Sequence, residues 1–135
     1  MKLDSEFDYT EPEVWAFLDD KFHFTLDAAA SEQNHRCADY LSRERDAFKT
    51  PWYGRVFCNP SWGSGLNKWV ERALEQRVNT ELIVLLLPYR VHSKWFKLLK
   101  INNIRIDILS GKAQVEGSKR IHEFHSIVAI LGGKA

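Results

Sequence analysis

The sequence contains little cysteine and no long apolar run, and both shortages limit the kind of protein it encodes. Its 135 residues include 2 cysteines, Cys37 and Cys58, which are too few for a disulfide framework and form no Cys-x-x-Cys pair. The longest apolar run, Leu82 to Pro88, is far too short to span a bilayer. The first six residues turn acidic at once and lack the apolar core of a signal peptide. The sequence therefore predicts a cytoplasmic protein with reduced thiols and no membrane contact.

An excess of charge of one sign is also lacking, because the formal net charge is only +1. Residues 1–50 nevertheless carry 6 Lys and Arg against 12 Asp and Glu, whereas residues 51–135 carry 13 against 6. A basic face is therefore available if the second part of the chain supplies it. The length and the 44% of hydrophobic residues are typical of a soluble globular domain, and we expect residues 1–135 to form one domain.

Hydrophobic periodicity predicts helices and strands that alternate along most of the chain. Thr10 is placed to cap a helix whose first turn contains Pro12. Continuous apolar runs predict buried strands, and apolar residues three and four apart predict helices. We expect helices over about 11–20, 66–76 and 93–101, strands over 22–27, 55–58, 81–87, 104–108 and 126–131, and loops over 31–54 and 110–123. This order predicts an α/β fold with a mostly parallel sheet and an antiparallel hairpin at its C-terminal edge.

Two polar clusters directly follow predicted strands. The first is Asp27 with the small residues Ala28, Ala29 and Ala30, and the second is the tetrad Asn59-Pro60-Ser61-Trp62. In open α/β sheets ligands bind beyond the carboxyl ends of the strands, and small residues there let backbone and ligand approach closely. The two clusters are therefore the candidate site.

The tetrad resembles motif IV of DNA amino-methyltransferases, in which Asn, Asp or Ser precedes Pro-Pro and an aromatic residue. Together with its flanking sequence, the chain resembles the small, Dam-like phage DNA N6-adenine methyltransferases over roughly residues 9–131. The features that carry this resemblance are, in order, Thr10 and Pro12, Leu26-Asp27-Ala28-Ala29-Ala30, Asn59-Pro60-Ser61-Trp62, Trp69, Leu87-Pro88 and Trp95-Phe96.

The resemblance implies a Rossmann-like methyltransferase fold with helices on both faces of the sheet, and methyl transfer from S-adenosylmethionine to adenine N6 in DNA. Asn59 and Pro60 would accept the two amine hydrogens, and Trp62 would stack on a base flipped out of the duplex. In a phage or prophage, this activity would mark DNA against restriction or compete with host modification. The residues expected to contact the cofactor are Thr10, Pro12, Asp27, Ala28, Ala29, Asp46 and Asn59.

DNA is the expected partner, and four cations are the candidates for phosphate contacts, although they also fit a solvated face: Lys94, Lys112, Lys119 and Arg120. No inserted target-recognition domain is present, which favours a homodimer. We expect no metal, because His122 and His125 would face opposite ways in a strand.

Structural interpretations of these residues stay open beside the functional ones. Asp27 fits a helix cap, and Trp62 fits loop packing. Ser61 stands where the family pattern has a second proline, so the alternative is a methyltransferase fold without transfer activity that binds DNA or a protein partner. The same chemistry on cytosine N4, on RNA or on a small molecule is a further alternative. The remaining aromatic residues are expected in the core: Trp15, Trp69, Trp95 and Phe96.

Overall fold

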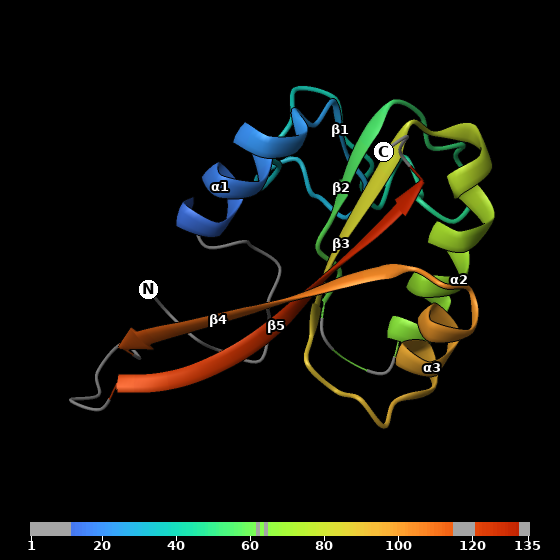
Figure 1. The fold of residues 1–135 in the computed structure, drawn as a ribbon. Coiled ribbons are helices and arrows are strands. Elements are labelled where there is room, and N and C mark those ends of the chain that lie inside the picture. The colour runs from blue at the N-terminus through green and yellow to red at the C-terminus, as the bar shows by residue number, and fades with distance from the viewer. Residues whose placement is uncertain (1–11, 62, 64, 115–120, 133–135) are drawn as a thin grey trace.

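The computed structural model describes residues 12–61, 63, 65–114 and 121–132, and these form a mixed sheet with helices against it (Figure 1). The sheet has five strands in the order β1-β2-β3-β5-β4. The elements are α1 (Pro12–Phe22), β1 (Leu26–Asp27), β2 (Arg55–Cys58), α2 (Leu66–Gln76), the short 3-10 helix η1 (Arg77–Asn79), β3 (Leu82–Pro88), α3 (Lys94–Ile101), β4 (Arg105–Gln114) and β5 (Ile121–Gly132).

Strand direction follows the predicted scheme. β1, β2 and β3 are parallel neighbours, with Leu26 opposite Val56 and Cys58 opposite Leu85. β5 lies between β3 and β4 and is antiparallel to both, so β4 runs in the same direction as β3. The α/β fold class, with a mostly parallel sheet and an antiparallel C-terminal hairpin, is therefore confirmed.

The strands alternate their side chains between two apolar layers, one on each face of the sheet. On one face, Leu18 of α1 packs in a cluster with Phe57, Val84 and Val128. The other face carries the larger cluster, which includes residues of α2 and α3 together with Ile83. Figure 1 shows the same division, with α1 on one side of the sheet and α2 and α3 on the other. Helices cover both faces, as expected.

β3 is the central strand, and every residue from Leu82 to Pro88 is buried. This burial explains the continuous apolar run of the segment, because a strand that is covered on both faces has no face that needs polar side chains. The helix predicted over 66–76 is found as α2 with the same bounds. α3 begins after Ser93, whose hydroxyl accepts a hydrogen bond from the Phe96 backbone N–H at 3.3 Å. No helix in the part of the chain that the structure describes is long and apolar enough to cross a membrane.

The strand predicted over 22–27 is wrong in most of its length. α1 continues to Phe22, and His23 then adopts the left-handed conformation with φ of 53°. The Asp19 carboxylate accepts a hydrogen bond from the Phe24 backbone N–H at 3.0 Å, which ends the helix and removes that donor from the sheet. The Phe24 ring instead packs against Phe57 on the α1 face, at 5.2 Å between ring centroids. Only Leu26–Asp27 pairs as β1.

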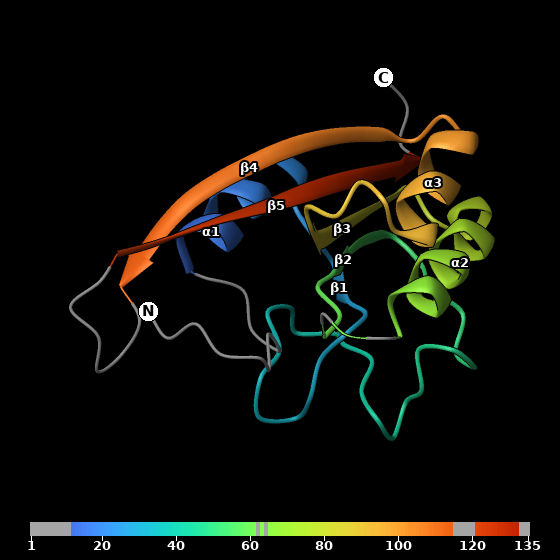
Figure 2. The same ribbon diagram turned by 90° about the horizontal axis from the view of Figure 1, so that it is seen from below.

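The bounds predicted for the loop over 110–123 are also wrong, because β4 continues to Gln114 and β5 already begins at Ile121. The ladder between them extends from Arg105 opposite Ile130 to Gln114 opposite Ile121. β5 pairs with β3 only from Ser126 onward, so the outer part of the hairpin is a two-stranded ribbon that extends past the sheet (Figure 2). The pairing of β4 with β5 accounts for this segment, which the apolar pattern of the sequence did not indicate.

Candidate active site

The two polar clusters meet at the carboxyl ends of neighbouring parallel strands. The Ala28 backbone N–H donates to the Phe57 carbonyl at 2.9 Å, which continues the pairing of β1 with β2 by one step. This bond places the small residues 28–30 beside Asn59 and Pro60, which directly follow β2. The described residues of both clusters thus lie at the same edge of the sheet.

A cavity of about 610 Å³ opens at this edge, a volume typical of a small-molecule site. Its lining comes from two loop segments that follow β1, from the described start of the tetrad and from one residue of α2. The lining residues are Ala28, Ala29, Ala30, Ser31, Glu32, Gln33, Asn34, Leu41, Ser42, Arg43, Glu44, Asp46, Ala47, Phe48, Asn59, Pro60, Ser61 and Trp69.

Asp27 lies beneath the cavity and is not among the residues that line it. Its two carboxylate oxygens accept hydrogen bonds from the backbone N–H groups of Ala29, at 3.3 Å, and Arg36, at 2.9 Å. Its own backbone pairs with the segment around Tyr40, since the Leu41 N–H donates to the Asp27 carbonyl at 2.8 Å. Burial raises the pKa of Asp27, and the two backbone hydrogen bonds oppose that rise. Asp27 therefore fixes the loop that forms one wall of the cavity.

The described part of the tetrad lies at the rim of the cavity. Asn59 is buried at 5% exposure, Pro60 is also buried, and both line the cavity. Ser61 lines it as well and is exposed. The amide side chain of Asn59 and the residue Pro60 thus lie together where β2 ends at the cavity.

Asp46 and an aromatic pair form another part of the lining. The Asp46 carboxylate accepts a hydrogen bond from the Phe48 backbone N–H at 2.8 Å, which shapes the turn that carries both residues. The rings of Phe48 and Trp69 meet edge to face at 4.7 Å between centroids. We call Phe48 and Trp69 the aromatic wall. It gives the cavity aromatic ring surface beside a carboxylate.

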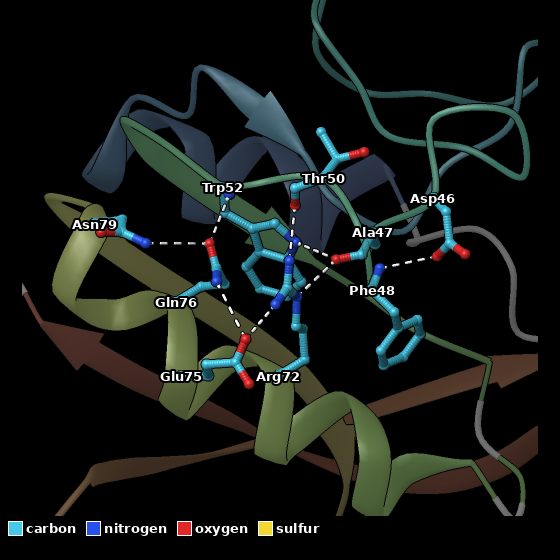
Figure 3. Close-up of polar contacts among 9 residues, drawn as sticks. All are labelled: Asp46, Ala47, Phe48, Thr50, Trp52, Arg72, Glu75, Gln76 and Asn79. Carbon is cyan, nitrogen blue, oxygen red and sulfur yellow. Dashed lines mark hydrogen bonds and ion pairs between the residues drawn. The ribbon is translucent and has the colours of Figure 1, made fainter.

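The turn that carries Asp46 and Phe48 is held against α2 by a polar network (Figure 3). The Ala47 carbonyl accepts hydrogen bonds from Trp52 Nε1 at 2.8 Å and from Arg72 Nε at 2.9 Å, and Arg72 also donates to the Thr50 carbonyl at 3.0 Å. The Trp52 backbone N–H donates to Gln76 Oε1 at 2.9 Å. α2 thus positions the aromatic wall from both sides, because it supplies Trp69 and fixes the turn opposite.

The predicted site residues are only partly brought together. Ala28, Ala29, Asp46, Asn59 and Pro60 all line the cavity. Pro12 begins α1, on the opposite face of the sheet from α2 and α3.

Of the cations predicted to bind DNA, Lys94 is not among the described residues that line the cavity. Lys94 is exposed on α3, and Lys112 lies in β4 opposite Glu123. The four predicted residues Thr10, Trp62, Lys119 and Arg120 lie outside the described residues.

Several residues of the site were not identified from the sequence. Trp15 and Trp95 pack as predicted, and Trp69 does contact the core, but it also lines the cavity. Its helical spacing could not separate a core face from a cavity face. Phe48 had a weak signal, as an aromatic residue in a polar segment. Arg72 and Gln76 had none, because polar residues on a helix normally face solvent.

Nucleophilic and metal chemistry have no support among the described residues. The pKa of the Cys37 thiol is raised to about 12, mainly by burial and to a smaller extent by the negative charges of Asp27, Asp19 and Asp39. Burial likewise raises the pKa of the Cys58 thiol. In the described ranges no cluster of three or more His, Cys, Asp or Glu side chains is placed to hold a metal ion.

Comparison with known proteins identifies relatives over most of the chain. The family model described as DNA N-6-adenine-methyltransferase (Dam) matches residues 3–122. A DNA N-6-adenine-methyltransferase of Escherichia phage T1 is 35% identical over 101 residues, covering 72% of this chain and 42% of that protein. One of Haemophilus phage HP1 (strain HP1c1) is 28% identical over 103 residues, covering 69% of this chain and 59% of that protein. The chain thus spans less than two thirds of the length of either relative.

A solved structure shows the same fold at low sequence identity. The precorrin-6y C5,15-methyltransferase of Geobacter metallireducens GS-15 superposes with a TM-score of 0.54 at 13% identity, covering 99% of this chain and 93% of that one. This similarity bears on the fold alone. It confirms the predicted Rossmann-like methyltransferase fold.

Proposed function

The chain belongs to the DNA N-6-adenine-methyltransferase (Dam) family, and we propose that it transfers a methyl group from S-adenosylmethionine to the N6 amine of adenine in DNA. One observation carries the proposal. Asn59 and Pro60 directly follow β2 and line a 610 Å³ cavity together with the segments that follow β1 and with Trp69 of α2. The two proposed acceptors of the amine hydrogens thus lie directly beside the cavity proposed to hold the cofactor.

The lining suits an adenosine with a charged amino-acid chain. The small side chains of Ala28, Ala29 and Ala30 leave room for close approach to the backbone. Asp46 offers carboxylate oxygens to ribose hydroxyls, and the aromatic wall offers a flat surface to a purine. Asp27 acts on the cofactor site indirectly, because its carboxylate accepts hydrogen bonds from the Ala29 and Arg36 N–H groups and so shapes the loop that lines the cavity. When bound, S-adenosylmethionine supplies a methyl group activated by its sulfonium sulfur.

The tetrad prepares the amine for attack. The N6 lone pair of adenine is delocalised into the ring, so the amine is a poor nucleophile. The Asn59 side-chain oxygen and the Pro60 carbonyl accept its two hydrogens and favour a more tetrahedral nitrogen, whose lone pair then points at the methyl carbon. Bound S-adenosylmethionine would supply the methyl group and keep the electron pair of the broken C–S bond on sulfur, while Asn59 and Pro60 would hold the amine until one N6 proton passes to water. Positioning supplies the rate enhancement without a strong base.

The remaining roles and properties are proposed from the sequence alone. Trp62 is proposed to stack on the flipped base, and Thr10 to lie near the cofactor. A single domain over residues 1–135, a homodimer and a cytoplasmic location stay predictions.

An Asn59→Ala variant tests the mechanism. Loss of one preorganised hydrogen-bonding group costs about 10²- to 10³-fold in turnover. We expect this loss in the transfer of labelled methyl groups to unmodified DNA, whereas calorimetric affinity for the demethylated cofactor should fall by a much smaller factor, because the rest of the cavity lining is unchanged. Nuclease digestion and mass spectrometry of the product distinguish N6-methyladenine from N4-methylcytosine.

Asn79→Ala is the matched control, because Asn79 is exposed on η1 and lies outside the cavity lining. It removes a 3.4 Å hydrogen bond to Gln76 Oε1 but leaves the shorter bond from the Trp52 backbone N–H in place. It should transfer methyl groups at the wild-type rate. An Asn59→Ala enzyme with near wild-type turnover would overturn the mechanism. A folded wild-type protein that binds DNA but not the cofactor would overturn the proposed function in favour of a binding module.

A further inference from the structure

The loop between β3 and α3 exposes two large apolar side chains at the same edge of the sheet as the tetrad. Tyr89 is 44% exposed and Val91 is 41% exposed, directly after a strand in which every residue is buried. Figure 1 shows that this loop and the segment after β2 both leave the sheet at its lower edge. Exposed apolar side chains grouped beside a functional site mark a contact surface.

The strand register sets the distance of this loop from the acceptors. Cys58 pairs with Leu85, so Asn59 lies level with Leu86, and Tyr89 follows three residues later. At about 3.3 Å per strand residue, Tyr89 lies roughly 10 Å further along the strand direction than Asn59.

The loop lies on the side of the tetrad opposite the cavity. The cavity is lined from segments beside β1, by the tetrad and by Trp69, and no described residue of β3 or of 89–93 takes part in its lining. The sheet order β1-β2-β3 therefore places the tetrad between the cavity and this loop. The loop follows β3, the strand beside β2, so it lies on the β3 side of the acceptors that a substrate must reach.

The charge of the segment suits a polyanion. Residues 89–100 contain no Asp or Glu, although the whole chain is almost neutral. The segment carries four exposed cations, Arg90, Lys94, Lys97 and Lys100. The alternation of exposed apolar and basic side chains matches a nucleic-acid surface, where cations bind phosphates and apolar side chains contact bases.

We propose that Tyr89 is a wedge that enters the DNA duplex beside the target adenine, while Arg90 and Lys94 bind the flanking phosphates. This inference rests on the proposed function. A base in a duplex cannot reach the acceptors until it leaves the stack, and unpairing it costs a few kcal/mol. An aromatic side chain that fills the vacated space offsets part of this cost, because it stacks on the exposed neighbouring bases.

The experiment compares Tyr89→Ala and Tyr89→Phe on three DNA substrates that contain the sequence the wild-type enzyme methylates. These are the paired duplex, the same duplex with an abasic site opposite the target adenine, and the single strand. We expect Tyr89→Ala to lose about tenfold or more in kcat/KM on the paired duplex and to recover most of it on the other two, where flipping costs little. Tyr89→Phe keeps the ring and should retain the wild-type rate on all three.

Tyr53→Ala is the matched control. Tyr53 is 43% exposed but precedes β2, at the opposite edge of the sheet, so its removal should change no substrate's rate. Affinity for the demethylated cofactor should be equal in all variants. A 2-aminopurine base at the target position should brighten when the wild-type enzyme binds the duplex, and brighten less with Tyr89→Ala.

The outcomes separate the two proposals. An equal loss on all three substrates, or no loss on the paired duplex, overturns the wedge and leaves methyl transfer intact. A wild-type protein that binds the cofactor yet methylates none of the three, nor unmodified genomic DNA, overturns the proposed function and the wedge with it.

Discussion

Replacing Arg72 with Met should loosen the turn that carries Asp46 and Phe48. The Arg72 side chain is only 12% exposed and donates to the carbonyls of Ala47 and Thr50, at 2.9 and 3.0 Å. Methionine keeps much of the apolar stem and removes both donors. The ion pair with Glu75 is lost as well, but Glu75 is 65% exposed, so that pair contributes little.

The expected cost follows from the two hydrogen bonds. A hydrogen bond from a charged donor contributes about 1.5–3 kcal/mol. Ala47 keeps the bond from Trp52 Nε1, and half-buried Thr50 can turn its carbonyl to water, so each loss lies at the low end. The sum is about 3 kcal/mol of the free energy of unfolding. With a urea m-value of about 2 kcal/mol/M, the midpoint falls by roughly 1.5 M.

Urea titration followed by tryptophan fluorescence measures this difference, and Arg105→Met is the matched control. Arg105 pairs with Asp107 at 3.0 Å, but both side chains are well exposed, at 61% and 44%. Such a surface pair is worth about 0–1 kcal/mol, so Arg105→Met should shift the midpoint by less than about 0.5 M. Arg72→Lys should fall between Arg72→Met and wild type, because a lysine cannot reproduce the two-pronged geometry.

Equal midpoints for Arg72→Met and Arg105→Met would refute the reasoning, because the network would then be no stronger than a surface ion pair. An unchanged affinity of Arg72→Met for the demethylated cofactor, despite the loss of stability, would show that the turn keeps its shape without α2.

Three further predictions follow from burial and from the cavity lining. Because burial raises the pKa of Asp27, the folded state binds its proton more tightly than the unfolded state, so the stability of wild type relative to Asp27→Asn should fall as the pH rises from 3.8 through the raised pKa. Urea titrations on both sides of that window measure this, and a pH-independent difference would contradict it. Phe48→Ala should weaken binding of the demethylated cofactor about tenfold, because stacking of an aromatic ring on a base is worth about 1–3 kcal/mol. Phe17→Ala is the control and should not change this affinity, because Phe17 is 59% exposed on α1. Equal calorimetric affinities for the two variants would count against the aromatic wall. Cys37 and Cys58 should resist alkylation in the native protein and react after denaturation, and rapid native labelling seen by mass spectrometry would contradict their burial.

The sequence predicted best those elements whose own residues determine them. α2 has the predicted bounds because its apolar residues form one clear stripe, and β3 was evident from its apolar run. The tetrad was predictable for a related reason, since it directly follows a short buried strand, β2.

The errors arose where a distant residue decides the local structure. Phe24 belongs to an aromatic run typical of a strand, yet its backbone N–H donates to the Asp19 carboxylate and its ring packs against Phe57. The outer part of β4 looked like a loop because the partner strand is its only support in the sheet. Phe48 and Arg72 have their roles only because the turn at 46–50 folds against α2. No local pattern records such a contact.

The position of β5 in the sheet has a consequence for the order in which the chain can fold. β5 is the last strand in sequence, yet it lies between β3 and β4. A nascent chain that has released β4 but not β5 therefore holds the wholly apolar β3 with one edge unpaired, and β4 has nothing to pair with. An open apolar edge of this kind templates association with other chains. Ribosome stalling or proteolysis before residue 126 should thus produce aggregation, and not a smaller folded protein.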